Sequence, residues 1–101
     1  MKKTFIIIFS LLIVSCSKNA PDLMEIAQLS LDQNEEDKAI KNLELLINKF
    51  PNDSLASLAQ YKLVNIYKNW KHNPELVSIA LDKTVKNYPG TIQARQAAKE
   101  I

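Results

Sequence analysis

Cys16 is the residue whose type and position most clearly allow a specific chemistry. It is the one cysteine in 101 residues, so it cannot form an internal disulfide, and one cysteine with one histidine cannot complete a zinc site. It follows Lys2, Lys3 and the apolar run Phe5 to Val14, which is too short to span about 30 Å of hydrocarbon as a helix. A basic start, a short apolar run and small residues are the three parts of an export signal. The sequence therefore predicts a cleaved signal segment over residues 1–15.

The residues before the cysteine, Ile13-Val14-Ser15-Cys16, resemble the lipobox of bacterial lipoproteins. In that motif a β-branched or Leu residue, a small residue and then Gly, Ala or Ser precede the cysteine that receives the lipid. The resemblance implies cleavage between Ser15 and Cys16, a thioether diacylglycerol on Cys16, and usually a further acyl chain on the new N-terminus. Several acyl chains, at about 0.8 kcal/mol per buried CH₂, hold a protein durably on a bilayer. We expect a lipid-anchored protein; the alternative is an uncleaved anchor with a chance cysteine.

The remaining candidates for catalysis or ligand binding are isolated from one another. His72 has no serine, cysteine or acidic partner at a suitable spacing, so we expect a surface histidine in a turn and not a catalytic base. Gly90, the single glycine, cannot build a Gly-rich phosphate loop. The acidic run Glu35-Glu36-Asp37 is expected to be a solvated helix start, where negative charge is favourable, and metal binding is the alternative. We therefore expect no enzyme activity, no cofactor and no metal site.

Several apolar and aromatic residues have two interpretations. Trp70 and the tyrosines occur at helical spacing, which is more typical of a packed core than of a ligand cage. Leu45 and Ile79 fall off the main apolar stripes of their segments. Scattered exposed apolar residues are ordinary, so a partner contact at these two positions is the less favoured interpretation.

Charge and composition limit the class of protein and partner. The chain has 47% hydrophobic and 24% charged residues with one glycine, which is typical of a small, strongly helical globular domain. Without Lys2 and Lys3, the 13 basic residues become 11, which equals the 11 acidic ones. A balanced domain without a basic stripe argues against nucleic acid as a partner.

The apolar spacing and the caps predict five helices. After a tether at residues 16–21, the helical domain is expected at 22–101, with the first helix ending near residue 33 and the second running to Phe50, where Pro51 stops it. The third, the central helix, should follow the turn and cap residues Asn52-Asp53-Ser54, run to about Lys71, and pack against one helix before it and one after it. Two more helices are expected, one at 74–88 with Asn73 as its cap, and one at 92–101. The last should face inward with Ala94, Ala97, Ala98 and Ile101 and present a polar outer face suited to capping a solenoid.

A similar four-residue pattern recurs near two of the predicted helix ends. Asn48-Lys49-Phe50-Pro51 and Lys86-Asn87-Tyr88-Pro89 each close a helix and precede a polar turn and an Ala-rich helical start. Period and helix pairing resemble tetratricopeptide repeats, in which each helix A and helix B pair stacks on the next. Residues that match the family pattern are Ala39, Leu43 and Pro51 in helix B and Ile26, Leu63 and Tyr67 in helix A; Ser30, Val64 and Val77 depart from it.

The linker between the first two pairs adds a closer resemblance, to envelope repeats of the BamD and YbgF (CpoB) kind. Two segments match the residue types and the spacing of that linker: Phe50-Pro51-Asn52-Asp53-Ser54 and Ala59-Gln60-Tyr61-Lys62-Leu63. The resemblance implies an all-α solenoid of about two and a half repeats. It also implies a lipid-anchored protein in the bacterial envelope, at the outer membrane and facing the periplasm.

The function that we expect from this sequence is recognition of another envelope protein or peptide segment. In tetratricopeptide stacks the helix A surfaces line the face that takes such a segment, and the polar candidates on it are Gln60, Asn65, Lys68 and Asn69. By analogy, the module would assist outer-membrane assembly or cell-wall coordination. The alternatives are a non-catalytic subunit of an envelope enzyme and a small carrier for an apolar ligand.

Overall fold

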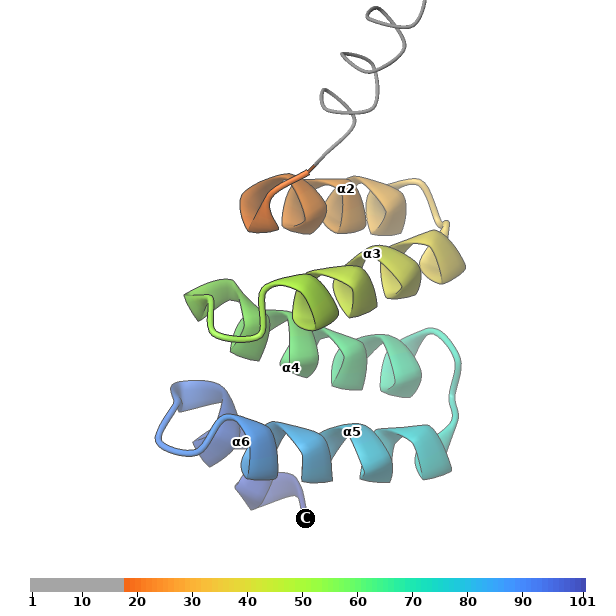
Figure 1. Ribbon diagram of the computed structural model, residues 1–101. Helices are drawn as coiled ribbons and strands as arrows, with labels where there is room; N and C mark the ends of the chain where they lie inside the picture. The colour runs from red at the N-terminus through yellow and green to blue at the C-terminus, as the bar shows by residue number, and fades with distance from the viewer. Residues whose placement is uncertain (1–17) are drawn as a thin grey trace, which may run out of the picture.

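The computed structural model describes residues 18–101, which form a stack of five α-helices (Figure 1). Short turns join the helices, and each packs against the next one along the chain. The predicted all-α fold, a short solenoid of stacked helices, is confirmed. The helices are α2 (Ala20–Asp32), α3 (Glu36–Lys49), α4 (Ser54–Asn69), α5 (Pro74–Asn87) and α6 (Ile92–Glu100). The predicted signal segment, Ser15 and Cys16 lie outside the described residues.

Side-chain caps explain where four of these helices begin. At α4, the Asp53 carboxylate accepts a hydrogen bond from the Leu55 amide. At α5, the Asn73 side chain accepts one from the Leu76 amide, and Pro74 is the first helical residue. Thr91 caps α6 in the same way. The α3 start has no side-chain cap; Glu36 and Asp37 lie in its first turn, where their charge favours the helix dipole.

The first helix begins earlier than the sequence predicts. The Asn19 side chain accepts a hydrogen bond from the Asp22 amide, and the Asp22 carboxylate accepts one from the Asn19 amide. The two bonds together form a complete capping box. Ala20 is the first helical residue and is 1% exposed. The predicted tether at 16–21 is therefore wrong at its end, because Asn19 and Ala20 already belong to the folded domain.

The core divides into two clusters that share the central helix. The first joins α2, α3 and α4 through fully buried side chains such as Leu23, Leu43 and Ile66. The second joins α4 to α5 and α6 through Val64, Leu81 and neighbouring alanines. Because α4 contributes to both clusters, the prediction that it packs against a helix on each side is confirmed.

Three residues expected in the apolar stripes are exposed instead. Trp70 is the C-cap of α4 and is 38% exposed, while Ala98 and Ile101 lie at the exposed end of α6. All three lie at or near helix ends, where the neighbouring helix no longer covers the stripe.

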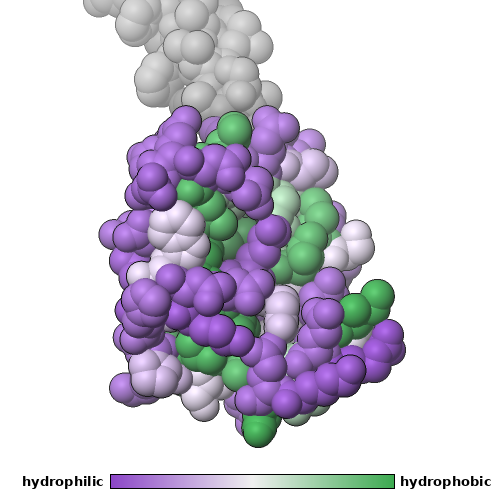
Figure 2. All heavy atoms as spheres, turned by 180° about the vertical axis from the view of Figure 1, so that it is seen from behind, coloured by the Kyte–Doolittle hydropathy of each residue, from purple (hydrophilic) through white to green (hydrophobic). Residues whose placement is uncertain are grey.

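The side of the stack turned away from the viewer of Figure 1 is mostly hydrophilic, with hydrophobic patches between the polar side chains (Figure 2).

Two non-glycine residues take left-handed backbone conformations in the turns. Asn34, between α2 and α3, has φ 61°, as expected for a residue that tolerates this region. His72, between α4 and α5, has φ 51°, a conformation that is uncommon for any residue other than glycine. Gly90 supplies the third positive φ, 84°, before α6.

Candidate functional site

The helices α2, α4 and α6 lie side by side and are cross-linked by polar contacts along α4. Lys62 on α4 donates to Gln28 on α2 at 3.2 Å, and Ser57 donates to Gln93 on α6 at 3.2 Å. We call the solvent-facing side of these three helices the inner face. It corresponds to the helix A surface that the sequence predicts as the recognition face.

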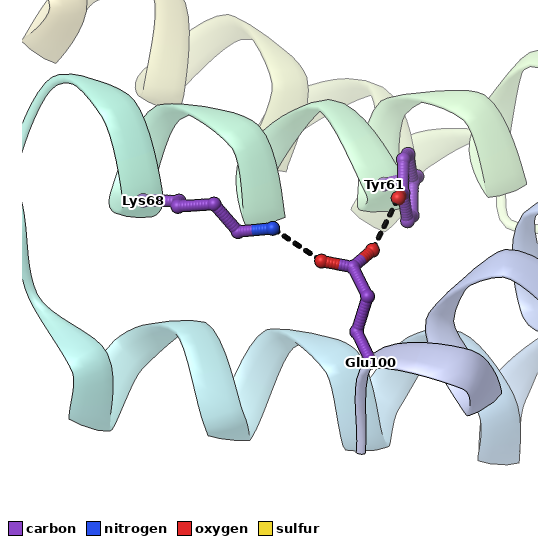
Figure 3. A network of polar contacts seen from close by, with 3 residues as sticks. All are labelled: Tyr61, Lys68 and Glu100. Atoms are coloured by element: carbon purple, nitrogen blue, oxygen red, sulfur yellow. Dashed lines mark hydrogen bonds and ion pairs between the residues drawn. The ribbon is translucent and has the colours of Figure 1, made fainter.

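A three-residue network fastens the end of α6 to α4. The Glu100 carboxylate pairs with the Lys68 ammonium through one oxygen and accepts a hydrogen bond from the Tyr61 hydroxyl through the other (Figure 3). These hydrogen bonds, first from Lys68 and then from Tyr61, lower the pKa of Glu100. The hydrogen bond to Glu100, with burial and the carboxylate charge, raises the pKa of Tyr61 to about 12. At neutral pH the network therefore holds an ionised carboxylate beside an intact phenol.

An open cleft of about 630 Å³ lies beside this network, at the end of α6. We call it the end cleft. Its apolar walls come from α5 and the C-terminal residue, and its charged rim from the Lys68–Glu100 pair. A protein segment with an apolar side chain flanked by polar groups fits such a lining. The lining residues are Lys68, His72, Asn73, Pro74, Val77, Ser78, Leu81, Glu100 and Ile101.

The structure separates the four predicted recognition residues. Asn65, Lys68 and Asn69 are exposed on α4, as predicted, whereas Gln60 is only 4% exposed. At about 100° per residue, positions 60 and 65 lie roughly 140° apart around the helix. The assignment of Gln60 to the exposed face is therefore wrong. Its spacing of three and seven residues from Leu63 and Tyr67 places it on their buried side, and this spacing was visible in the sequence.

Gln60 instead contributes to a second depression, of about 350 Å³, between α3 and α5. We call it the outer groove. α4 forms its floor with Gln60, Leu63 and Tyr67, and burial together with the Glu44 charge raises the pKa of Tyr67. The walls are Glu44, Ile47 and Asn48 on α3 and Leu76, Ile79, Ala80 and Lys83 on α5. The apolar spacing in the sequence had already placed Ile79 off the main stripe of its helix. The groove itself could not be predicted, because it depends on how three helices are placed relative to one another.

Other sequence candidates lie apart from these two surfaces. Glu36 and Asp37, from the acidic run, pair with Lys71 at 3.9 and 2.5 Å, and the hydrogen bond to Asp37 is the main cause that raises the Lys71 pKa. Glu36 and Asp37 therefore join the start of α3 to the turn that follows α4. Among residues 18–101 there is no group of three or more His, Cys, Asp or Glu side chains placed to hold a metal ion.

None of the helices in residues 18–101 combines the length and the apolar character needed to cross a bilayer.

Comparison with known proteins adds no relative: no family model, no curated protein and no solved structure matches this chain. A helical stack of this kind can serve unrelated tasks, so the fold does not specify the function. The functional conclusion therefore rests on the residues of the inner face, the end cleft and the outer groove.

Proposed function

We propose that this chain is a lipid-anchored interaction module of the bacterial envelope that binds a segment of another protein on its inner face. The observation that carries the proposal is the end cleft, which continues the inner face beside α4 and combines apolar walls with a charged rim. The partner segment would lie along α4, over Asn65 and Asn69, and insert an apolar side chain against Val77 and Leu81. Its polar groups would meet Lys68 and Glu100 at the rim.

The exposed residues of α4 suit an extended partner. Asn65 and Asn69 are four residues apart, so they lie one turn apart on the same side of the helix. Each side-chain amide offers both donors and an acceptor, which matches the alternating N–H and C=O groups of an extended backbone. The contacts of Lys62 with Gln28 and of Lys68 with Glu100 hold α4 between its neighbours, which reduces the ordering cost of binding.

The anchor is proposed from the sequence motif, and the cap of α2 determines how close the anchor is to the domain. Only Ser17 and Lys18 separate Cys16 from the capping residue Asn19. Three residue steps span at most about 11 Å, so a lipid on Cys16 would hold α2 close to the bilayer surface. We propose the outer membrane, on its periplasmic side, as the location, with outer-membrane assembly or cell-wall coordination as the process served.

The lining favours a protein segment over the alternative of an apolar small molecule. A protein that carries an apolar small molecule encloses most of that ligand in an apolar cavity. The end cleft and the outer groove instead open to solvent, and both include charged side chains.

Site-specific photo-crosslinking in the intact cell envelope tests the proposal. A photoreactive side chain at Asn65, Asn69 or Ser78 should give the same adduct with one envelope protein, because these positions border the proposed segment. The matched control is Asn87, an exposed amide at the end of α5 that lies outside both depressions. Adducts of equal yield at Asn87, or none at the three test positions, would contradict recognition at the inner face.

A further inference from the structure

The outer groove exposes apolar side chains that the proposed function does not use. On α5, Leu76 is 37% and Ile79 is 45% exposed, although both are large aliphatic residues. Ile47 on α3 and Tyr67 on the floor are half-buried and continue the same apolar surface. Exposed apolar surface that lines a groove marks an interaction site more often than scattered residues do.

The two walls of the outer groove carry opposite charges. Glu44 lies exposed on the α3 wall and Lys83 lies exposed on the α5 wall. Neither belongs to the ion pairs found within residues 18–101, which use Lys68, Lys71 and Lys86. The groove therefore presents one negative and one positive rim, each open to a partner.

Charge is also distributed unevenly along the whole stack. Residues 18–53, which include α2 and α3, contain four basic and eight acidic residues. Residues 54–101, which include α4 to α6, contain seven basic and three acidic residues. Two copies placed in opposite stacking order would set the acidic half of each against the basic half of the other, and complementary potentials of this kind favour association.

We propose that the outer groove joins two copies of this chain about a two-fold axis parallel to the helices. Such an axis puts α3 of each copy opposite α5 of the other, so Glu44 meets Lys83 of the second copy at two equivalent places. A two-fold interface is self-complementary in this sense, and it is the commonest symmetry of soluble oligomers. Leu76 and Ile79 of each copy then cover Ile47 and Tyr67 of the other.

This arrangement is compatible with membrane anchoring but does not depend on it. A two-fold axis parallel to the helices leaves the N-terminal ends of both α2 helices at the same end of the dimer. Both anchors can then enter one bilayer. The inner face lies on the other side of α4 from the outer groove, so partner recognition and self-association can be tested separately.

Charge reversal on the full chain, purified in detergent, tests the interface by sedimentation with the detergent mass subtracted. The wild type should sediment as two chains. Glu44→Lys and Lys83→Glu should each weaken association by about 10- to 100-fold, because each places like charges together twice. An equimolar mixture of the two variants should form a heterodimer, since both contacts then again join opposite charges. The double variant should also regain the dimer.

Matched reversals at exposed positions outside the groove serve as controls. Glu25→Lys on α2 and Lys99→Glu on α6 change the net charge equally and should leave the dimer intact. Circular dichroism of each variant shows whether it is folded. A monomeric wild type, a dimer that all reversals leave unchanged, or a mixture of the two groove variants that stays monomeric would each overturn the proposal.

Discussion

Lys68 of the central helix pairs with Glu100, the last residue of α6, and Tyr61 donates to the other oxygen of the same carboxylate. The contact joins residues 32 positions apart and fixes the end of the stack beside the end cleft. Exposed ion pairs contribute little alone. Here the phenol adds a second bond to the carboxylate, and the two contacts give the network measurable signatures at both ends of the pH range.

Alkaline titration should identify this network through Tyr61. Its pKa is raised from 10.0 to about 12, so its contribution to stability is present below pH 10 and is lost as the pH rises toward 12. Ultraviolet absorbance should show tyrosine ionisation near pH 12, and Tyr61→Phe should reduce that component. Glu100→Gln should return the Tyr61 pKa toward 10.0, because it removes the carboxylate that accepts the Tyr61 hydrogen bond and, with it, the negative charge. An unchanged titration in Glu100→Gln would show that another group holds the proton.

Acid titration should show the opposite sign for Glu100. Its pKa is lowered from 4.5 in the folded state, so its contribution is present above pH 4.5 and is lost as the pH falls through the folded value. Urea unfolding of the wild type and of Glu100→Gln should therefore differ near neutral pH and converge at the acid end. Parallel stability curves down to the lowest pH would contradict the Lys68–Glu100 contact.

Truncation of the central helix should separate buried from exposed positions. Leu63 is 4% exposed and belongs to the first core cluster, so Leu63→Ala should lower the free energy of unfolding by about 2 to 5 kcal/mol. Trp70→Ala is the matched large-to-small control at the end of the same helix, where the side chain is 38% exposed, and it should cost less. Denaturant melts compare the two. A Leu63→Ala variant as stable as the wild type would show that this side of α4 is not in the core.

The sequence predicted the fold well because local signals agreed with one another. Leu23, Ala39, Leu43 and Leu46 repeat at helical spacing, and the expected cap residues Asp53 and Asn73 lie at the observed helix starts. The first boundary was missed because Asn19 was assigned to the tether although it forms a capping box with Asp22. Such local errors shift a helix end by a turn or less and leave the stack unchanged.

The candidate site was predicted less completely because it depends on contacts between distant segments. Asn65, Lys68 and Asn69 were correctly placed on an exposed side of α4, but Gln60 was judged by its polarity and not by its phase with Leu63. The pairing of Lys68 with Glu100 requires the length of α6 and its position across α4, and no local pattern encodes either. The outer groove likewise arises from the spacing of α3 and α5 over α4.

The left-handed turn at His72 should be a site of easily gained stability. A non-glycine residue in this conformation costs roughly 1–2 kcal/mol, and glycine offsets part of that gain through its greater freedom when unfolded. His72→Gly, with φ 51° at that position, should therefore stabilise the domain by about 0.5 to 1 kcal/mol. His72→Ala keeps the strain and should show no such gain, and Asn34→Gly should change little because Asn tolerates φ 61°. Equal stability of His72→Gly and His72→Ala would argue against a strained turn.

Lipid attachment at Cys16 is the prediction on which the proposed location depends. Labelled fatty acid fed to expressing cells should enter the wild-type chain and not Cys16→Ser, because only a thiol can form the thioether on which the anchor is built. The variant should retain its signal segment and so run at a higher mass, whereas Ser17→Ala, one residue beyond the cysteine, should be labelled and processed normally. The short link to Asn19 adds a geometric readout: a Gly/Ser insertion of about ten residues after Lys18 should make α2 more accessible to protease at the membrane, since such a linker extends the reach by roughly 15 Å or more. Equal labelling of the wild type and Cys16→Ser would overturn the anchor, and with it the outer-membrane location.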